Sequence, residues 1–477
     1  MTYPAFIFWI LFLKSTVSSQ RTLLILLFAS FTFGSLAVLP PEITAGSSFV
    51  PKTMFAVLII TRFLAVPLLT FSPRVIELAR AENLGFLLAF LLIGLVSTIF
   101  MPRFFADTIN VVPLKFVRFA SSEALQPTQA NLTQSIYLSV SVAVTFATAL
   151  MARSPQFPRQ LLSAALVGGV VLVGSGIADI VATAAGQSAL LDPFRNASYA
   201  MITNAEIGGV RRVVGLMPEA SSYGSGCVAF AAAITFLRPL YPAGFPRTAA
   251  SLTALALIGM ALLSTSSSAY AGLAIFGAAN ALNVGRRMTG GSAIGLTGLG
   301  VELSVAFLAI IGLLLALILQ PDAFDPLLRI IDEIIFNKAT SDSFLERSYW
   351  NDVGWNALWS TYGLGVGLGS TRASNYFVAV ISNTGLLGAG CFFIFLLQTL
   401  FRRSSASPQS SEMVSALKFT IIPSLGMAAL GSATPDFEPW LGLIFGAITG
   451  LSLQPGYGSH VTRYADVTPY HDRAISR

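Results

Sequence analysis

Long apolar stretches separated by short polar segments run through almost the whole chain. A helix needs about 20 mostly apolar residues to cross the hydrocarbon core of a bilayer. Stretches of this kind lie at 22–39, 53–71, 84–102, 135–152, 160–183, 223–240, 249–264, 268–284, 293–319, 373–401, 414–432 and 439–453. We therefore predict an all-α polytopic integral membrane protein, a single domain over residues 1–455 with about 12 transmembrane helices. The apolar run at 4–13 is short for a span, and the sequence leaves open whether it forms one.

The basic residues of the short connections indicate an orientation. They fall in alternate gaps between the predicted spans: Lys14, Arg21, Arg74, Arg80, Arg153, Arg159, Arg238, Arg247, Arg286, Arg287, Arg402 and Arg403. Short cytoplasmic loops are enriched in lysine and arginine, so we expect these gaps, both termini and the tail at 456–477 to be cytoplasmic. The long segments 103–134, 186–222 and 320–372 then lie on the opposite face. Within the last, 325–337 has the spacing of an amphipathic helix on the membrane surface, and a tryptophan-rich helix follows it.

Composition excludes several classes of protein. Of the 477 residues, 54% are hydrophobic and only 10% are charged, which is too few charges to cover a soluble protein of this length. The net charge of +6 reflects the loop arginines, so we expect no nucleic-acid partner. Cys227 and Cys391 lie inside apolar segments and predict neither a disulfide framework nor a zinc site. We expect no cofactor and no metal.

The stretch GLGVGLGSTR at 363–372 alternates glycines before a predicted span. Backbone N–H groups near Gly367, Gly369 and Ser370 could converge on an anion at a helix N-terminus, and Arg372 would add a fork suited to phosphate oxygens. The alternative is a tight turn in which backbones pack closely. A dinucleotide-binding loop is excluded because no strand precedes the glycines.

A second stretch, RRVVGLMPEASSYGSG at 211–226, precedes another helix that starts on the same face. Arg211, Arg212 and Glu219 are its charged residues. They could bind lipid headgroups and stabilise a helix start, or they could belong to a site. Together the two stretches offer what a lipid-linked diphosphate requires at that face, which is positive charge without nucleotide or metal.

Carboxylates supply the candidates for a general base. Both histidines, His460 and His471, lie in the predicted cytoplasmic tail, so histidine is not available on the opposite face. Glu219 is the first choice because its neighbours can bind phosphate, and Asp352 is the second. The other carboxylates considered are Asp342, Glu346, Asp436 and Glu438.

Charged residues inside predicted spans usually face a partner or a cavity. Arg62, Glu302 and Lys418 are of this kind, and Arg62 and Glu302 either pair with one another or contact substrate. Further site candidates are Arg347, Asn375 and Tyr223.

Two blocks resemble a known family. The run VVGLMPEASSYGSGCVAFAAA at 213–233 is similar to the G-x-x-E-P/A-S-x-Y/F segment of bacterial O-antigen polymerases and O-antigen ligases. The run YWNDVGWNALWSTYGLGVGLGSTRASNYFVAVISNTGLLGAGCFF at 349–393 resembles their second signature, in which a tryptophan-bearing helix leads into G-x-G-x-G-S. The order of the two blocks and their placement on the outer face also agree with that family.

The resemblance implies a GT-C-like glycosyltransferase of the bacterial inner membrane. It implies a polyprenyl-diphosphate-linked oligosaccharide as donor, an acceptor sugar hydroxyl as nucleophile, a periplasmic active face and no metal. The arginines that grip the diphosphate would be Arg211, Arg212 and Arg372. Membrane lipid and a chain-length regulator protein would be further partners.

Two positions depart from the family pattern. Ser374 stands before Asn375 where ligases carry histidine, and Ala269 follows Ser268 where many members have arginine. The missing histidine favours a polymerase of O-antigen or exopolysaccharide repeat units over an O-antigen ligase. The main rival is a polysaccharide flippase or other secondary transporter, which should show an internal repeat and mostly short outer loops. A non-catalytic assembly subunit is a third alternative.

Overall fold

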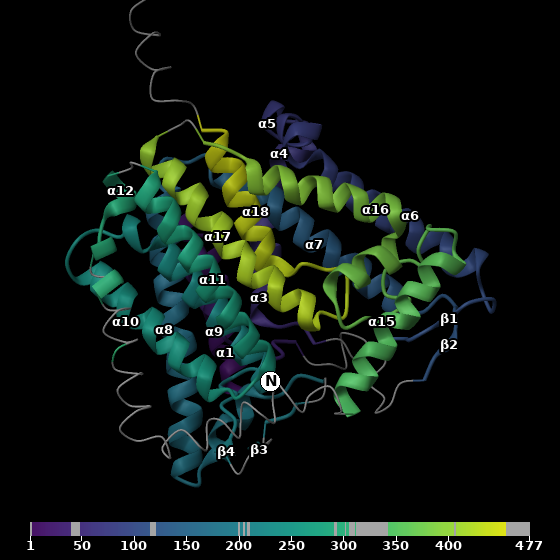
Figure 1. Cartoon of the computed structure of the whole chain (residues 1–477), viewed down its shortest axis with the longest axis horizontal. Helices are drawn as coiled ribbons and strands as arrows, with labels where there is room; N and C mark the ends of the chain where they lie inside the picture. Colours follow the sequence, from purple (N-terminus) through teal and green to yellow (C-terminus); the bar gives the residue numbers. More distant parts are fainter. Residues whose placement is uncertain are drawn as a thin grey trace, which may run out of the picture.

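The protein is an almost entirely helical bundle in the computed structural model (Figure 1). The structure describes residues 2–39, 48–114, 121–198, 201–203, 206–207, 210–290, 293–300, 302–304, 311, 342–404 and 407–454. The helices that form the body of the bundle are α1 (Tyr3–Thr16), α2 (Gln20–Ser30), α3 (Pro51–Ile60), α6 (Phe86–Phe104), α7 (Gln129–Met151), α8 (Phe157–Ala184), α9 (Ala220–Leu237), α10 (Phe245–Leu263), α11 (Ser267–Thr289), α16 (Tyr376–Phe401), α17 (Pro408–Gly431) and α18 (Glu438–Ser452). The helix α15 (Asp342–Ser360) and several short elements complete the fold. The short elements are η2 (Thr61–Ala65), α4 (Val66–Leu69), α5 (Pro73–Leu78), η3 (Ala81–Gly85), η4 (Ser188–Phe194), η5 (Arg238–Leu240), α12 (Ala293–Leu296), and the antiparallel pairs β1 (Asn110–Val111) with β2 (Glu123–Ala124) and β3 (Glu206–Ile207) with β4 (Val210–Arg211).

Eight helices among the described residues are long and apolar enough to cross a membrane. They are Pro51–Leu69, Ala81–Phe104, Gln129–Met151, Phe157–Ala184, Ala220–Leu240, Phe245–Leu263, Tyr376–Phe401 and Pro408–Gly431. This confirms an all-α, multi-pass membrane protein. Each of these helices overlaps a stretch that hydropathy selects, because a buried or lipid-facing helix must be apolar along its whole length.

The other predicted spans are not among these eight helices. The stretch 22–39 is helical only over α2, which has 11 residues, and 439–453 corresponds to α18, which has 15. The helix α11 has 23 residues but a more polar composition than the eight. Most of 293–319, and all of the amphipathic segment 325–337 and the tail 456–477, lie outside the described residues. A total of about 12 spans thus stays a prediction.

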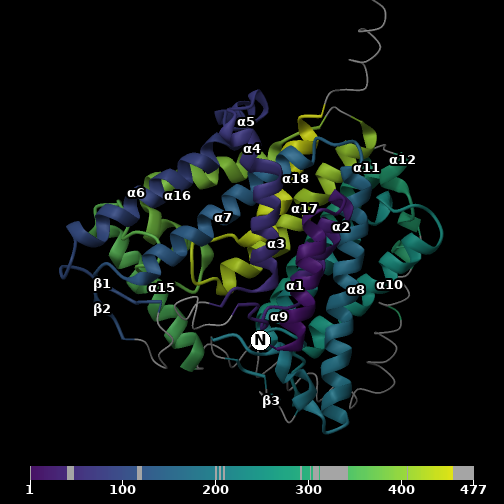
Figure 2. The same cartoon turned by 180° about the vertical axis from the view of Figure 1, so that it is seen from behind.

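The basic gaps of the chain meet at one end of the bundle. Arg153 pairs with Glu77 at 2.9 Å, so the connections after the second and fourth predicted spans are neighbours. Arg402 donates to the side chain of Asn83 at 2.9 Å and brings a third such gap to the same place. In Figures 1 and 2 this end carries α5 and α12, whereas α15 and the two β-hairpins lie at the opposite end. The long segments therefore gather at the end away from the arginines.

The first helix runs in the direction that the sequence analysis did not expect. The ring of Tyr3 lies 5.8 Å from that of Phe194, which follows α8 at the long-segment end. At the other end of α1, Gln20 donates a hydrogen bond to the carbonyl of Met151, next to the arginine-rich connections. The helix α1 thus joins the two ends, and the expectation that the chain starts at the arginine-rich end does not agree with this geometry.

The suggested pairing of Arg62 with Glu302 is wrong. Glu302 instead binds two arginines of the basic gaps, Arg238 at 2.5 Å and Arg287 at 2.6 Å. Arg62 is exposed and lies near the backbone carbonyl of Ser15. The carboxylate of Glu302 thus binds two guanidiniums and stabilises the arginine-rich end of the bundle.

Helix α18 packs unusually closely against α7 through a row of glycines. Gly442, Gly446 and Gly450 recur every fourth residue, so they lie on one face of α18. A Cβ atom at Gly446 would be 2.4 Å from the carbonyl oxygen of Thr145, and one at Gly450 would be 2.3 Å from that of Ala149. Small residues at such spacing allow the close approach of helices within membranes. This contact fixes the start of α18 against α7, where the candidate site begins.

Candidate functional site

A cavity of about 600 Å³ opens among the long-segment ends of the helices. Residues of both long segments that carry the family resemblance border it, including Glu219 from the first and Arg347 from the helix α15 of the second. Side chains from α3, α7, α17 and α18 complete its wall. Its size and mixed lining suit a small ligand or part of a larger one.

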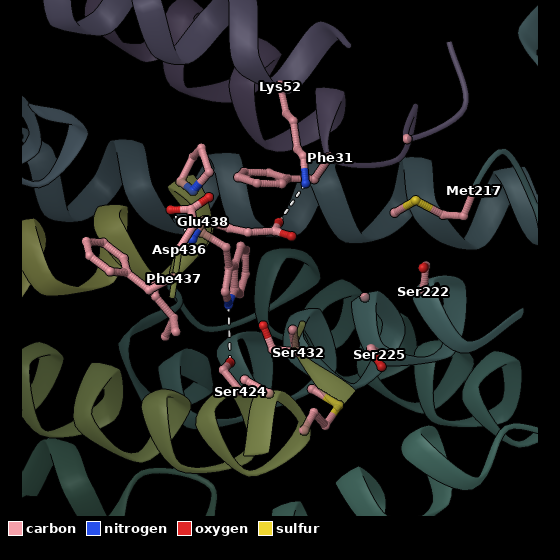
Figure 3. Close-up of a pocket in the computed structure, with 18 of the residues that line it drawn as sticks. Phe31, Lys52, Met217, Ser222, Ser225, Ser424, Ser432, Asp436, Phe437 and Glu438 are labelled. Carbon is pink, nitrogen blue, oxygen red and sulfur yellow. Dashed lines mark hydrogen bonds and ion pairs between the residues drawn. The ribbon is translucent and has the colours of Figure 1, made fainter. Parts of the chain in front are cut away.

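The charged part of the cavity lies at the start of α18 (Figure 3). Lys52, in the first turn of α3, pairs with Glu438 at 2.6 Å. Asp436 lies beside Glu438 and accepts a hydrogen bond of 3.2 Å from its backbone N–H. The side chain of Glu438 is deep in the molecule but 58% exposed, because it faces the cavity. Two carboxylates and one ammonium thus converge on the same space.

The backbone at this point is strained. Glu438 has φ 58°, a left-handed conformation that is costly for a residue with a side chain. Such conformations cost on the order of 1–3 kcal/mol and concentrate at functional sites. Here the conformation turns the chain into α18, and the Lys52 ion pair accompanies it.

The pKa of the Asp436 carboxyl group is raised well above its ordinary value. Burial raises its pKa to about 6, and the neighbouring carboxylate of Glu438 raises it further, whereas Ser141, the Glu438 N–H and Lys52 act in the opposite sense. A carboxyl group with such a pKa is ionised at neutral pH and can take up a proton readily.

Glu219 borders the cavity at the N-terminus of α9. It is the N-cap residue of this helix, and its Oε1 accepts a hydrogen bond from the hydroxyl of Ser221. Burial lowers the pKa of Arg212, while the nearby carboxylate of Glu219 opposes that shift. Arg212 also donates to the carbonyl of Ser264 at 3.2 Å. The structure therefore brings Glu219 and Arg212 together, and Glu219 borders the cavity.

A buried ion pair holds the segment that carries Glu219. Asp179 of α8 binds Arg195 at 2.9 Å, and these side chains are 3% and 7% exposed. The other carboxylate oxygen accepts the backbone N–H groups of Val214 and Gly215, at 2.9 and 3.1 Å. Arg211 lies 3.8 Å from the same Asp179 and donates to Thr183, so it does not line the cavity. Its placement in this network is structural, contrary to the expected diphosphate contact.

Arg372 is not among the residues that border the cavity. Its guanidinium carbon is 3.7 Å from the ring centroid of Trp350, a cation–π contact, and its backbone N–H donates to Val112 at 2.8 Å. Burial lowers its pKa; Glu346 opposes this shift and Arg347 reinforces it. The arginine that borders the cavity from this side is Arg347.

Asp352 does not belong to the cavity. It lies on α15, as predicted for the tryptophan-rich helix, but its side chain is on the exposed face. It is not among the residues that border the cavity, whereas Arg347 of the same helix is. Its assignment as a second general base therefore does not agree with this structure.

The glycine stretch serves packing in this structure. Gly363, Gly365, Gly367 and Gly369 all have positive φ, and a Cβ at Gly369 would be 2.4 Å from the carbonyl oxygen of Ala130. The alternating pattern thus lets the chain turn against neighbouring backbones. Ser370 is buried and its hydroxyl is bonded to Asn131.

The N–H groups of this stretch bond to a break in α16. At Gly385 the helix is interrupted, with φ 70° and ψ −177°. The freed carbonyls of Ser382 and Asn383 accept the N–H groups of Val366 and Gly367, each at 2.9 Å. At membrane depth such groups must find partners within the protein. Of the three N–H groups expected to bind an anion, that of Gly367 thus has the Asn383 carbonyl as acceptor and that of Ser370 has the Gly367 carbonyl, at 3.2 Å. The anion-binding role of the loop stays a prediction.

Two further candidates have structural roles. Asn375 is the N-cap of α16, and its side chain accepts the N–H of Phe377 at 2.9 Å. Tyr223 is fully buried, and its hydroxyl donates to the carbonyl of Leu172 at 3.2 Å. Both residues fix helices that border the cavity.

Aromatic and hydroxyl side chains form the remaining wall of the cavity. Trp440 of α18 packs against Phe230 at a centroid distance of 4.8 Å and donates its indole N–H to Ser424 at 3.2 Å. Ser222 and Ser225 lie on the facing helix α9 (Figure 3). Sugar rings present both apolar faces and hydroxyl groups, so a wall of this composition suits them.

Sequence reasoning missed Lys52 and gave Asp436 little weight. Lys52 stands at the start of a span, and Asp436 and Glu438 stand in a very short turn, positions at which charges usually reach water. The sequence did show that Lys52, Asp436 and Glu438 all flank predicted spans on the long-segment face. Only the packing of α18 on α7 shows that they meet.

The chain matches no family model, no curated protein and no solved structure. The functional argument therefore depends on the cavity and its residues. Within the described ranges, no three His, Cys, Asp or Glu side chains are close enough together to hold a metal ion. Acid–base and electrostatic chemistry are what the charged residues of the cavity can supply directly.

Proposed function

We propose that the protein is a periplasmic-face polysaccharide polymerase of the bacterial inner membrane. It would transfer glycan from a polyprenyl-diphosphate-linked donor to an acceptor sugar hydroxyl, extending O-antigen or exopolysaccharide repeat units. The observation that carries the proposal is the cavity, because residues from both blocks that resemble the polymerase and ligase family border it. Met217 and Glu219 come from the first block and Tyr376 from the second.

The cationic groups supply the binding of the diphosphate in this proposal. Arg347 borders the cavity, Arg212 lies near Glu219 of the cavity lining, and Arg372 lies near Arg347. A diphosphate leaving group gains negative charge as the glycosidic bond breaks, and fixed positive groups in a water-poor site stabilise that charge strongly. In this proposal Arg347 contacts the diphosphate directly, a role that the family resemblance implied for Arg211, Arg212 and Arg372.

A carboxylate of the cavity and its aromatic wall would bind the acceptor. A sugar hydroxyl is a weak nucleophile and needs a base within hydrogen-bond reach. Glu219 and Asp436 both border the cavity, and they come from segments far apart in the sequence. Trp440, which is held by Ser424, offers a ring face for the sugar between them.

The test uses cells that lack the gene and carry variants of it. The proposal predicts single lipid-linked repeats on the outer face of the membrane and no long polymer in the deletion. Arg347→Ala should reduce polymer by about 100-fold or more at normal protein level, the loss typical of one electrostatic donor at a transition state. Arg103→Ala, which removes an exposed arginine at the same end of the bundle, is the matched control and should leave polymer unchanged. Normal polymer from Arg347→Ala would refute the proposed site.

A flippase or other secondary transporter is the second candidate, favoured by the break in α16. Transporters use interrupted helices at their binding sites. The break at Gly385 is, however, filled by the glycine loop through backbone hydrogen bonds. Repeats trapped on the cytoplasmic face of the deletion strain would favour the transporter and refute the polymerase.

A further inference from the structure

The cavity contains a cluster of titratable groups that the resemblance to a family did not indicate. Asp436, Glu438 and Lys52 meet at the start of α18, and they come from two elements far apart in the sequence. We propose that Asp436 is the proton acceptor for the attacking sugar hydroxyl and that the Lys52–Glu438 pair is its positioning partner. This inference rests on the proposed function and names a catalytic residue for it.

The geometry around Asp436 is fixed by rigid elements. The glycine face of α18 sets this helix against α7 with almost no gap, and Asp436 lies directly before the first turn of α18. Its carboxylate is bonded to the backbone N–H of Glu438, and the side chain of Glu438 is held by Lys52 of α3. A catalytic group must be held within a fraction of an ångström of its working position, and three packed helices meet that need.

Polar and charged groups from every neighbouring element face Asp436. These are Lys52 from α3, Tyr137 and Ser141 from α7, Tyr376 from α16 and Glu438 from α18. Burial raises the pKa of Asp436 to about 6; Glu438 adds to that shift and Lys52 opposes it. A base of this strength is mostly deprotonated at neutral pH, yet it binds a proton far better than an ordinary aspartate.

The second carboxylate of the cavity is placed for another task. Glu219 already accepts the hydroxyl of Ser221 and lies beside the Arg212 guanidinium. A carboxylate next to a cation is well suited to orient that cation toward a phosphate. Glu219 therefore acts on the side of the donor diphosphate, and Asp436 acts on the side of the acceptor hydroxyl.

The transfer step requires only Asp436, the two substrates and water. The acceptor O–H bond breaks and its proton moves to the Asp436 carboxylate, while the oxygen forms a bond to the anomeric carbon of the donor sugar. The bond between that carbon and the diphosphate oxygen breaks, and polyprenyl diphosphate leaves with the electron pair. The protonated Asp436 then returns its proton to water in the cavity before the next addition.

The test is the pH dependence of kcat/KM for the full-length protein in proteoliposomes. The substrate is the lipid-linked oligosaccharide extracted from cells that lack the gene, and elongation is measured between pH 5 and 8. The wild type should lose rate below about pH 6, where Asp436 becomes protonated. Asp436→Asn should lower the rate by about 10²–10⁴-fold and remove this acid limb. Asp436→Glu should recover part of the rate, and Asp192→Asn, an exposed carboxylate at the same end of the bundle, should behave as wild type.

Two further variants separate catalysis from a structural role. Glu438→Gln removes a negative neighbour, so the acid limb should move to lower pH. Lys52→Met removes a positive neighbour, so it should move to higher pH. Opposite shifts from the two members of one ion pair are not expected when loss of the pair merely loosens the fold.

The outcomes distinguish this inference from the function on which it rests. If the wild type elongates the substrate but Asp436→Asn keeps its rate and acid limb, the assignment of Asp436 is overturned and the polymerase stands. If Asp436→Asn does not fold, an acid limb that stays in place in both Glu438→Gln and Lys52→Met overturns the assignment. If the wild type elongates nothing at any pH, the proposed function fails and this inference fails with it.

Discussion

Replacement of Asp179 by alanine tests the account of how the Glu219 segment is held. The substitution leaves the Arg195 guanidinium, which is only 7% exposed, without its carboxylate at 2.9 Å. It also removes the acceptor of the Val214 and Gly215 N–H groups. Loss of one partner from a buried ion pair costs about 3–5 kcal/mol, because the remaining charge stays buried. The lost backbone bonds place the expected cost toward the upper end of that range.

The assay measures unfolding of the purified protein in mild detergent. The fraction of protein that stays monodisperse is recorded as the denaturant concentration increases. Glu77→Ala is the matched control, because its pair with Arg153 has the same 2.9 Å separation but side chains that are 38% and 16% exposed. An ion pair of that exposure contributes about 1 kcal/mol or less. Asp179→Ala should therefore lower the free energy of unfolding several times more than Glu77→Ala.

A second variant shows whether the loss of stability comes from the buried Arg195 guanidinium that is left without a carboxylate. Asp179→Leu combined with Arg195→Met replaces the pair by apolar side chains and should recover much of the loss, since buried pairs are often replaceable in this way. The reasoning would be refuted if Asp179→Ala were no more destabilising than Glu77→Ala. It would also be refuted if polymer formation survived Asp179→Ala in full, because the segment that carries Glu219 should then move.

Two further substitutions test the packing of α18 and the exclusion of Asp352. Gly446→Ala places a Cβ 2.4 Å from the Thr145 carbonyl oxygen and should cost about 1–3 kcal/mol in the same unfolding assay, whereas Gly390→Ala, which meets nothing within 4 Å, should be neutral or slightly stabilising. Equal effects of the two would show that α18 and α7 do not pack closely. Asp352→Asn should leave polymer yield within about twofold of wild type, because this side chain faces outward on α15 and surface substitutions rarely change function. A loss comparable to that of Arg347→Ala would return Asp352 to the site.

The long apolar stretches of the sequence were sufficient to predict most of the helices, because lipid and a packed helical core both require continuous apolar surface. They also placed the short helix α18 and the more polar helix α11, whereas the stretch 22–39 is helical only over α2. The direction of α1 could not be predicted, because it depends on the contact of Tyr3 with Phe194 and not on local composition.

The candidate site was predictable only in part. Glu219 could be found because it precedes a helix that starts on the long-segment face. Alternating glycines are compatible with an anion site and, more often, with a tight turn in which backbones pack closely; the break at Gly385 provides the backbone against which they pack. The meeting of Lys52 with Glu438 depends on the packing of α3, α7 and α18, which no single segment encodes.

Elongation of lipid-linked repeats by the purified protein in proteoliposomes distinguishes a polymerase from a transporter. Lipid-linked single repeats from the deletion strain are added to the outer leaflet, with a chelator present, and the lipid-linked products are separated by size. The account predicts a ladder of longer glycans with release of polyprenyl diphosphate, and a loss of that ladder in Arg347→Ala. Movement of intact single repeats across the membrane without any longer product would contradict the account and identify a transporter instead.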